Sequence, residues 1–365
     1  MKKAGYLEEY QLKLTVFGPL FVGSGKNYSK IGYLFDPVRN QVAFIREEAL
    51  FHWLVHTGNV DGYERELRSS YPDLEQFLQR CGISEKDRQA LIRYEVNAGM
   101  ALDAGHTLKE IQAFQRDGQG RAYVPGSSVK GALRTALLYE KLLTDSKPRK
   151  LTRKEFPNGR VQEEIDETLY FHTLYSKGDN SKERENAINS ILRGISIADS
   201  QPVPDTCMTL AGKRDVRADG RIKSINVVRE CIAPGTVLTF RLTLDRSILR
   251  NELTIDDIKR SIASFSNYYR TTYRSHFPQP RGGRFLKEDF LVLGGGSGFF
   301  GKTAIYPFLG YQRGLTFTAA KLSSNFRNHK HELDEEEYRT SPHCLKYTQT
   351  ADGMREFGIC KVEIS

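Results

Sequence analysis

Alternating apolar and polar residues predict several half-buried strands along the chain. The clearest is Tyr10–Val16, and the Gly/Ser-rich stretch after it, Val22–Lys26, predicts a flexible loop that breaks the strand. A turn at Asp36-Pro37 predicts a hairpin between Tyr33–Phe35 and Val42–Ile45. Three helices are expected next, at Glu47–His56, Tyr63–Arg80 and Ser84–Asn97. The first hundred residues therefore mix strands with a helical insertion.

The rest of the chain also mixes the two element types. A second hairpin is predicted from Ile111–Phe114 and Ala122–Val124, and Pro125-Gly126-Ser127-Ser128 predicts a turn and the start of a helix. Met208–Asn226 predicts a basic hairpin that turns at Ala218-Asp219-Gly220. The remaining predicted elements are strands at 195–198, 237–244, 290–293 and 358–364 and a helix at 254–273. Hairpins between helices, without regular βαβ alternation, predict an α+β fold, and two βαββαβ units fit the spacing.

Composition excludes several classes of protein. The 365 residues are 39% hydrophobic and 27% charged, as in soluble globular proteins, and their length predicts two domains. No apolar run is long enough for a membrane span, and the N-terminus lacks the apolar stretch of a secretory signal. The five cysteines form no CxxC pair, so neither a zinc site nor a disulfide framework is expected, and the expected compartment is the cytoplasm.

The positive charge is concentrated in one quarter of the sequence. Lys and Arg number 54 against 45 Asp and Glu, a net charge of +9. Thr209–Lys302 contains 17 basic and 9 acidic side chains, so this segment alone carries a surplus of +8. Such a surplus is typical of proteins that bind a phosphate backbone, although a solvated basic face explains it equally well.

Residues Gly296–Thr303 formally match the phosphate-binding pattern GxxxxGK[ST]. A nucleotide-binding loop opens a long helix, whereas Pro307 follows Thr303 here by four residues. A loop that lets a polynucleotide backbone approach main-chain N–H groups fits these glycines better, with Phe299 or Phe300 packed beneath it or stacked on a base. A tight strand-to-turn connection is the remaining interpretation.

Two sequence blocks resemble the RAMP proteins of CRISPR systems. One is Tyr123–Leu138, with Pro-Gly-Ser-Ser-Val-Lys-Gly-Ala-Leu-Arg at its centre, and the other is the glycine-rich block Leu293–Thr303. Val22–Gly25 and the C-terminal stretches Leu345–Thr348 and Phe357–Cys360 match as well. Together they are most similar to the RAMP subunit that caps the 3′ end of the crRNA in type III-A (Csm) effector complexes.

The resemblance implies two ferredoxin-like, RRM-related domains, which we place at residues 1–200 and 201–365. The first would contain a helical insertion at about 47–105 and a charged insertion at 145–190, and the second would contain the glycine-rich loop at 294–301. The chain shows no aromatic RNP1 signature, so base stacking on a sheet face is not expected.

The resemblance also implies binding of crRNA, a single-stranded RNA, without readout of its sequence. The implied partners are the neighbouring backbone RAMP subunit, the small helical subunit of the Csm complex and trimming nucleases. Lys130 and Arg134, four residues apart on one helix, are the expected phosphate contacts, and Lys213–Lys223 resembles a RAMP thumb. The full set of expected RNA-binding residues is Gly23, Ser24, Gly25, Ser127, Ser128, Lys130, Arg134, Gly294, Gly295, Gly296, Ser297, Gly298, Phe299 and Lys302.

Catalysis has less support in the sequence than binding. None of the eight histidines lies in a glycine motif; His329 and His331 are expected to be solvated in a polar segment. Asp36 lies where a related subunit carries a catalytic Asp, but Asp before Pro favours a turn, and Asp199 is expected to cap a turn. We therefore expect a non-catalytic subunit without metal or cofactor. A RAMP endoribonuclease that processes repeat RNA is the first alternative, and a nucleotide-binding enzyme using Gly296–Thr303 is the second.

Overall fold

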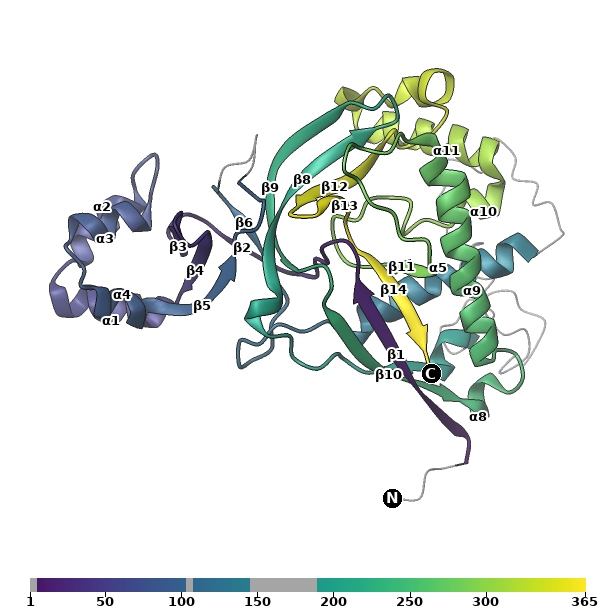
Figure 1. Ribbon diagram of the computed structural model, residues 1–365, viewed down its shortest axis with the longest axis horizontal. Helices are drawn as coiled ribbons and strands as arrows, with labels where there is room; N and C mark the ends of the chain where they lie inside the picture. The colour runs from purple at the N-terminus through teal and green to yellow at the C-terminus, as the bar shows by residue number, and fades with distance from the viewer. Residues whose placement is uncertain (1–4, 103–107, 145–188) are drawn as a thin grey trace.

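A computed structural model describes residues 5–102, 108–144 and 189–365. The chain has the α+β fold that the sequence predicts, with two curved sheets, helices on one side of the body and a small helical lobe at the other (Figure 1). The charged insertion expected at 145–190 lies almost wholly outside the described residues.

The smaller sheet has five strands in the order β11-β14-β1-β10-β7, and every neighbouring pair is antiparallel. The strands are β1 (Leu7–Val16), β7 (Ile195–Ile197), β10 (Val237–Asp245), β11 (Phe290–Val292) and β14 (Ile359–Ile364). Alternate residues of β1 and β10 are buried, as their apolar/polar alternation predicts.

This sheet contains a ferredoxin-like unit. In chain order the unit is β1, α5 (Gly126–Thr144), β7, β10, α9 (Ile255–Tyr268) and β14, and its strands are ordered β14, β1, β10, β7, all antiparallel, with β11 added at the edge beside β14. Helices α5 and α9 pack together through Tyr139 and Phe265, whose ring centroids lie 5.0 Å apart. Thr254 caps α9 in a capping box with Asp257, which explains why the helix begins there.

The larger sheet follows the order β2-β6-β9-β8-β5-β4-β3, and β12 joins it by pairing with β8 and β13. Its longest pair is the predicted basic hairpin, β8 (Met208–Arg217) and β9 (Ile222–Ile232), which curls along the body in Figure 1. The remaining strands are β2 (Gly23–Tyr28), β3 (Tyr33–Asp36), β4 (Gln41–Ile45), β5 (Ile92–Asn97), β6 (Ile111–Phe114), β12 (Cys344–Thr350) and β13 (Gly353–Glu356).

Each sheet takes strands from both sides of residue 200. In the smaller sheet, β10 lies between β1 and β7, and in the larger sheet β8 lies between β9 and β5. One continuous hydrophobic core includes residues of both sheets and of α5 and α9. A division at residue 200 would therefore separate strands that are hydrogen-bonded neighbours.

The predicted helical insertion forms a lobe with its own small core, which includes Leu50, Leu54 and Phe77. Its helices are α1 (Glu47–Thr57), α2 (Val60–Leu67), α3 (Leu74–Arg80) and α4 (Glu85–Leu91). The prediction of a single helix at Tyr63–Arg80 was wrong. Helix α2 ends at Leu67, before Pro72, and Asp73 caps a new helix. The helix expected at Ser84–Asn97 ends at Leu91, and β5 pairs with β4 instead.

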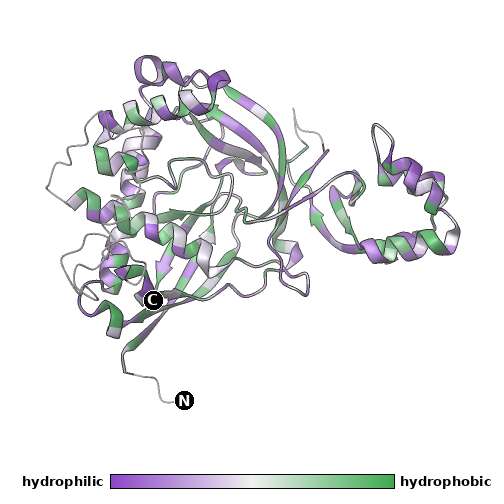
Figure 2. Ribbon diagram, turned by 180° about the vertical axis from the view of Figure 1, so that it is seen from behind, coloured by the Kyte–Doolittle hydropathy of each residue, from purple (hydrophilic) through white to green (hydrophobic). Residues whose placement is uncertain are grey.

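Three further helices complete the described fold: one packs against β1 and β10, the second against α5, and the third against the second. They are α8 (Arg246–Leu249), α10 (Ile305–Leu309) and α11 (Tyr311–Asn325). Among the described residues no helix is both long and apolar enough to cross a membrane. Hydrophilic and hydrophobic residues alternate along many of the strands (Figure 2), as expected for sheets with one covered face.

Candidate nucleic-acid interface

The start of α5 is fixed by hydrogen bonds from the chain just after β7. The Asp199 carboxylate accepts from the Gly126 amide at 2.8 Å, and the Ser200 hydroxyl accepts from the Val124 amide at 2.9 Å. A Cβ on Gly126 would overlap the Ile197 carbonyl oxygen, so only glycine fits at this position. Asp199 thus has the capping role that the sequence predicts, and the Pro-Gly-Ser-Ser turn is anchored from outside its own helix.

Beyond this anchor, α5 presents the predicted basic residues. Val129, Leu133 and the following apolar residues are buried, whereas Lys130 and Arg134 are half-buried. Burial lowers the pKa of Lys130. A Cβ added to Gly131, between them in sequence, would meet no atom within 4 Å, so open space lies beside the helix here. Ser127 is exposed in the first turn and Ser128 is half-buried.

The flexible loop expected at Val22–Lys26 is a strand. Gly23–Tyr28 forms β2, which pairs with β6 and is an outer strand of its sheet. The Ser24 hydroxyl donates to the Ala113 carbonyl oxygen at 3.3 Å. Gly25 has a positive φ of 81°, a backbone conformation that favours glycine. A Cβ added at this position would meet no atom within 4 Å, so the surface beside it is open.

The glycine-rich loop 294–298 folds back onto the segment before β2. The Gly295 amide donates to the Phe21 carbonyl oxygen at 2.7 Å, and a Cβ on Gly294 would overlap that same oxygen. Ser297 is buried and donates to the Gly294 carbonyl oxygen at 3.1 Å. The two glycine segments that the sequence singles out therefore meet at Phe21.

The aromatic residues after this loop belong to the core. Phe300 is 2% exposed and stacks on Tyr273 with ring centroids 4.4 Å apart, so it cannot stack on a base. Phe299 is half-buried against the same core. Lys302 is exposed. The amides of Lys302 and Thr303 both donate to the Phe299 carbonyl oxygen, so these two N–H groups are used within the turn.

A partly buried basic cluster under the glycine-rich loop was not predicted as a unit. It consists of Lys213 on β8, Arg229 on β9 and Lys346 on β12, with Asp215 as the carboxylate nearest to them. The Asp215 carboxylate lies 2.9 Å from Lys346 Nζ and 3.6 Å from Lys213 Nζ. Three cations around one carboxylate leave a local surplus of two positive charges.

Arg229 is the least compensated member of this basic cluster. Its side chain is 9% exposed between the rings of Phe21 and Phe357, and its Nε and Nη1 atoms have no hydrogen-bond partner among the described residues. A Cβ on Gly296 would lie 2.9 Å from the guanidinium carbon, so the loop rests directly on this group. Burial lowers the pKa of Arg229, and burial and the neighbouring Lys346 lower that of Lys213.

Sequence reasoning included Lys213 in the basic hairpin but missed Arg229 and Lys346. Arg229 and Glu230 lie side by side in the sequence, between Val228 and the pair Cys231 and Ile232 in the mostly apolar end of β9. A basic residue inside such a run was an available signal, because a buried charge needs a partner. Lys346 approaches the loop only because β12 pairs with β8, which no local pattern specifies.

Asp36, the carboxylate considered for catalysis, stabilises a turn. Asp36 Oδ1 accepts from the amides of Val38 and Arg39 at 2.9 and 3.0 Å, and these hydrogen bonds lower its pKa. Among the histidines, His331 is buried and not solvated as expected, because its ring lies against Asp334 and His343 in the interior of a folded segment.

The fold of the chain points to one protein superfamily, and a comparison with family models identifies it. The model of the RAMP superfamily matches residues 13–292, and the chain belongs to that superfamily.

Within the superfamily the chain resembles one kind of subunit along nearly its whole length. It is 26% identical to the "CRISPR system Cms protein Csm5" of Mycobacterium tuberculosis, with 98% of each chain covered. It is 25% identical to the protein of the same name from Enterococcus italicus, over 87% of this chain and 86% of that one.

Two solved structures have the same fold. A chain of a Csm-crRNA-target RNA ternary complex from a type III-A CRISPR-Cas system aligns with a TM-score of 0.68 at 18% identity, covering 97% of this chain and 100% of that one. Csm5 from T. onnurineus aligns with a TM-score of 0.62 at 17% identity, covering 96% and 99%.

Proposed function

We propose that this protein is a subunit of a type III-A Csm effector complex that binds crRNA near its 3′ end without cleaving it. The likeness to Csm5 proteins over nearly the whole chain supports membership of such a complex. The observation that carries the RNA-binding part is the basic cluster, where two nitrogens of the buried Arg229 lack partners among the described residues beneath the glycine-rich loop.

A phosphate group would supply what this cluster lacks, which is negative charge and hydrogen-bond acceptors. A buried guanidinium with unpaired N–H donors is costly, and a phosphate oxygen would supply both charge and acceptors. The glycines beside it carry no side chain, so a polynucleotide backbone can approach the loop and the open surface at Gly25. Contacts of this kind read no bases, so binding would tolerate any guide sequence.

The 3′-end position can be tested by photo-crosslinking in a reconstituted complex. Guides of one length would carry a single 4-thiouridine near the 5′ end, in the middle or near the 3′ end. We expect crosslinks to this chain from the 3′ probe alone. Crosslinks from the 5′ probe alone would contradict the placement, whereas crosslinks to none of the three would contradict RNA binding itself. The same complexes would reveal whether the backbone RAMP subunit and the small helical subunit are its neighbours.

The endoribonuclease alternative is tested on the purified chain. Asp36 is engaged in a turn, and His276 stacks on Tyr311 at 5.1 Å between ring centroids. We expect no cleavage of repeat RNA with or without divalent metal ions, and Asp36→Ala should leave target cleavage by the assembled complex unchanged. Cleavage by the purified chain, or loss of target cleavage in a normally assembled Asp36→Ala complex, would favour an enzyme.

The nucleotide-binding alternative has a poorer fit to the loop. Two of its amides are used within the turn, and α10 after it has only five residues, includes Pro307 and ends before Gly310. ATP with magnesium should therefore show no binding at micromolar concentrations. Micromolar binding that Lys302→Ala abolishes would overturn this conclusion.

A further inference from the structure

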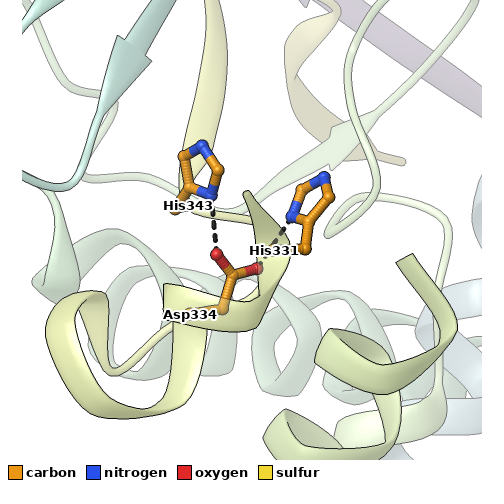
Figure 3. Close-up of side chains that lie close together, drawn as sticks. All are labelled: His331, Asp334 and His343. Atoms are coloured by element: carbon orange, nitrogen blue, oxygen red, sulfur yellow. Dashed lines mark hydrogen bonds and ion pairs between the residues drawn. The ribbon is translucent and has the colours of Figure 1, made fainter. Parts of the chain in front are cut away.

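A buried cluster of two histidines and one aspartate lies between α11 and β12. The chain there forms only single turns, at Arg327–His329, His331–Leu333 and Asp334–Tyr338. In Figure 3 the imidazoles of His331 and His343 both point at the carboxylate of Asp334. His331 Nδ1 lies 2.9 Å from Asp334 Oδ2, and His343 Nδ1 lies 2.6 Å from Oδ1. His331 is 5% exposed, His343 is 7% exposed and Asp334 is fully buried.

The donor atoms suit a transition metal. Each of the three side chains offers one ligand atom, and these atoms lie within 4.8 Å of one another. Two imidazole nitrogens and a carboxylate oxygen are ligands that zinc accepts in tetrahedral sites, at about 2.0–2.2 Å from the ion. Ligands at that distance are about 3.3 Å apart. To admit an ion, the two observed contacts would open by less than about 1 Å, and the widest pair of donor atoms would close by up to about 1.5 Å.

We propose that His331, Asp334 and His343 bind one divalent transition-metal ion, with zinc as the best match to these ligands. The ion would neutralise a wholly buried carboxylate that is otherwise surrounded, among the described residues, by hydrogen-bond donors. Ser341 Oγ already donates to Asp334 Oδ2 at 2.6 Å, the type of outer hydrogen bond that orients a carboxylate ligand. Three protein ligands leave a fourth position for water.

The position of the cluster gives the ion a structural role. The His343 carbonyl oxygen accepts from the Ala218 amide at 3.0 Å, and the Tyr338 hydroxyl accepts from Arg217 Nη2 at 2.5 Å. Both partners lie at the turn of the β8–β9 hairpin, whose strands carry the basic cluster. A metal cross-link between His331 and His343 would therefore fix the segment that holds the end of this hairpin.

Metal binding is measured on the full-length chain without RNA, so the result is independent of the proposed function. Chelator-treated protein would be dialysed against zinc and the bound metal counted, and cobalt would be used as a spectroscopic substitute. We expect one zinc ion per chain, a Tm that rises with zinc concentration and the intense visible absorption of tetrahedral cobalt. Absence of stoichiometric zinc in the wild-type protein would overturn the proposal and leave a hydrogen-bonded triad.

Variants identify the ligands. Asp334→Asn keeps the shape of the side chain but removes the charged ligand, and His343→Ala removes one imidazole. Each should weaken zinc affinity at least tenfold, whereas His56→Ala, which changes an exposed histidine on α1, should not. Zinc binding that both ligand variants retain would also overturn the proposal. The zinc stoichiometry of the wild-type protein decides the proposal by itself, so the proposal stays testable even if a variant fails to fold.

Discussion

The two basic regions of the candidate interface hold their charges in different environments. On α5, Lys130 and Arg134 are half-buried beside open space, on a helix whose apolar residues are packed in the core. Beneath the glycine-rich loop, Arg229 is enclosed by two aromatic rings and by the loop itself, with two nitrogens unpaired among the described residues. The α5 region carries its charges at the smaller cost to the fold, a partial burial that lowers the pKa of Lys130, and the region beneath the loop carries Arg229 at a larger cost.

This difference indicates where RNA should matter most. An accessible charge gains only a modest amount from meeting a phosphate, because water already solvates it. A buried charge without hydrogen-bond partners has lost that solvation, and a phosphate would restore it. We therefore expect Arg229 to contribute more to RNA affinity than either basic residue on α5, and to lower the stability of the free protein.

The cost of burying a charge can be measured near the basic cluster at Glu356, and this is the largest effect we expect. Burial raises the pKa of its carboxyl to about 7, although the Tyr269 hydroxyl and Arg274 oppose the increase. The folded protein then holds a proton that the unfolded chain loses near pH 4.5, so stability should fall as pH rises from about 4.5 to 7.

The total loss at Glu356 should be about 3 kcal/mol of unfolding free energy. Denaturant unfolding between pH 5 and pH 8 measures it. Glu356→Gln cannot ionise, so the difference between wild type and variant should follow this pH dependence, with the variant relatively more stable at pH 8. A difference that is flat across this range would show that the burial of Glu356 carries no such cost.

The second prediction concerns Arg229 itself. Arg229→Met keeps an apolar side chain of similar length and removes the charge, so affinity for single-stranded RNA should fall about 10- to 100-fold, the equivalent of one charge-assisted hydrogen bond or slightly less. The unfolding free energy should stay the same or increase, because an uncompensated buried charge is gone. Arg65→Met, on an exposed face of α2, is the control and should change neither quantity.

On α5, replacement of Lys130 and Arg134 together with Ala should reduce RNA affinity about tenfold. Each charge-assisted hydrogen bond to a phosphate is worth at most about 1.5–3 kcal/mol, and partial exposure reduces that value. The fold should survive, because the buried positions of α5 are unchanged. Fluorescence anisotropy gives the affinity and circular dichroism the fold; unaltered affinity would place α5 away from the RNA.

The last prediction compares two glycines, one in each region. Gly296→Ala places a Cβ against the Arg229 guanidinium at a φ of +74° and should destabilise the protein by about 1–3 kcal/mol. Gly131→Ala, in the interior of α5 and facing open space, should stabilise it by about 1 kcal/mol or less. Thermal or denaturant unfolding of both variants measures whether the free energy of unfolding falls or rises. Equal changes in the two variants would contradict the distinction between a required and a replaceable glycine.

The sequence predicts the elements well where the local pattern and the tertiary structure agree. β1, β10, α1, α9 and the β8–β9 hairpin lie close to their expected positions, because alternation, capping and turn residues all favour them. The prediction failed at Ile92–Asn97, where a helix was expected and pairing with β4 selects a strand. It also failed at Gly23–Gly25, because pairing with β6 outweighs the glycines' preference for a loop.

The candidate site was predictable only in part. The glycine segments and the basic face of α5 are continuous in sequence, so their motifs can be read directly. Arg229, Lys346 and the cluster of His331, Asp334 and His343 depend on strand pairing and on an irregular segment, so residues distant in sequence become neighbours only in the fold. His331 was expected in solvent because the residues beside it are polar.

The salt dependence of RNA binding tests the central claim most directly. The affinity of wild type and Arg229→Met for a guide-length single-stranded RNA would be measured over a range of potassium chloride concentrations. If Arg229 neutralises one phosphate, the slope of log affinity against log salt should be less steep in the variant by about 0.7. Identical slopes and affinities for the two proteins would contradict a phosphate site beneath the glycine-rich loop.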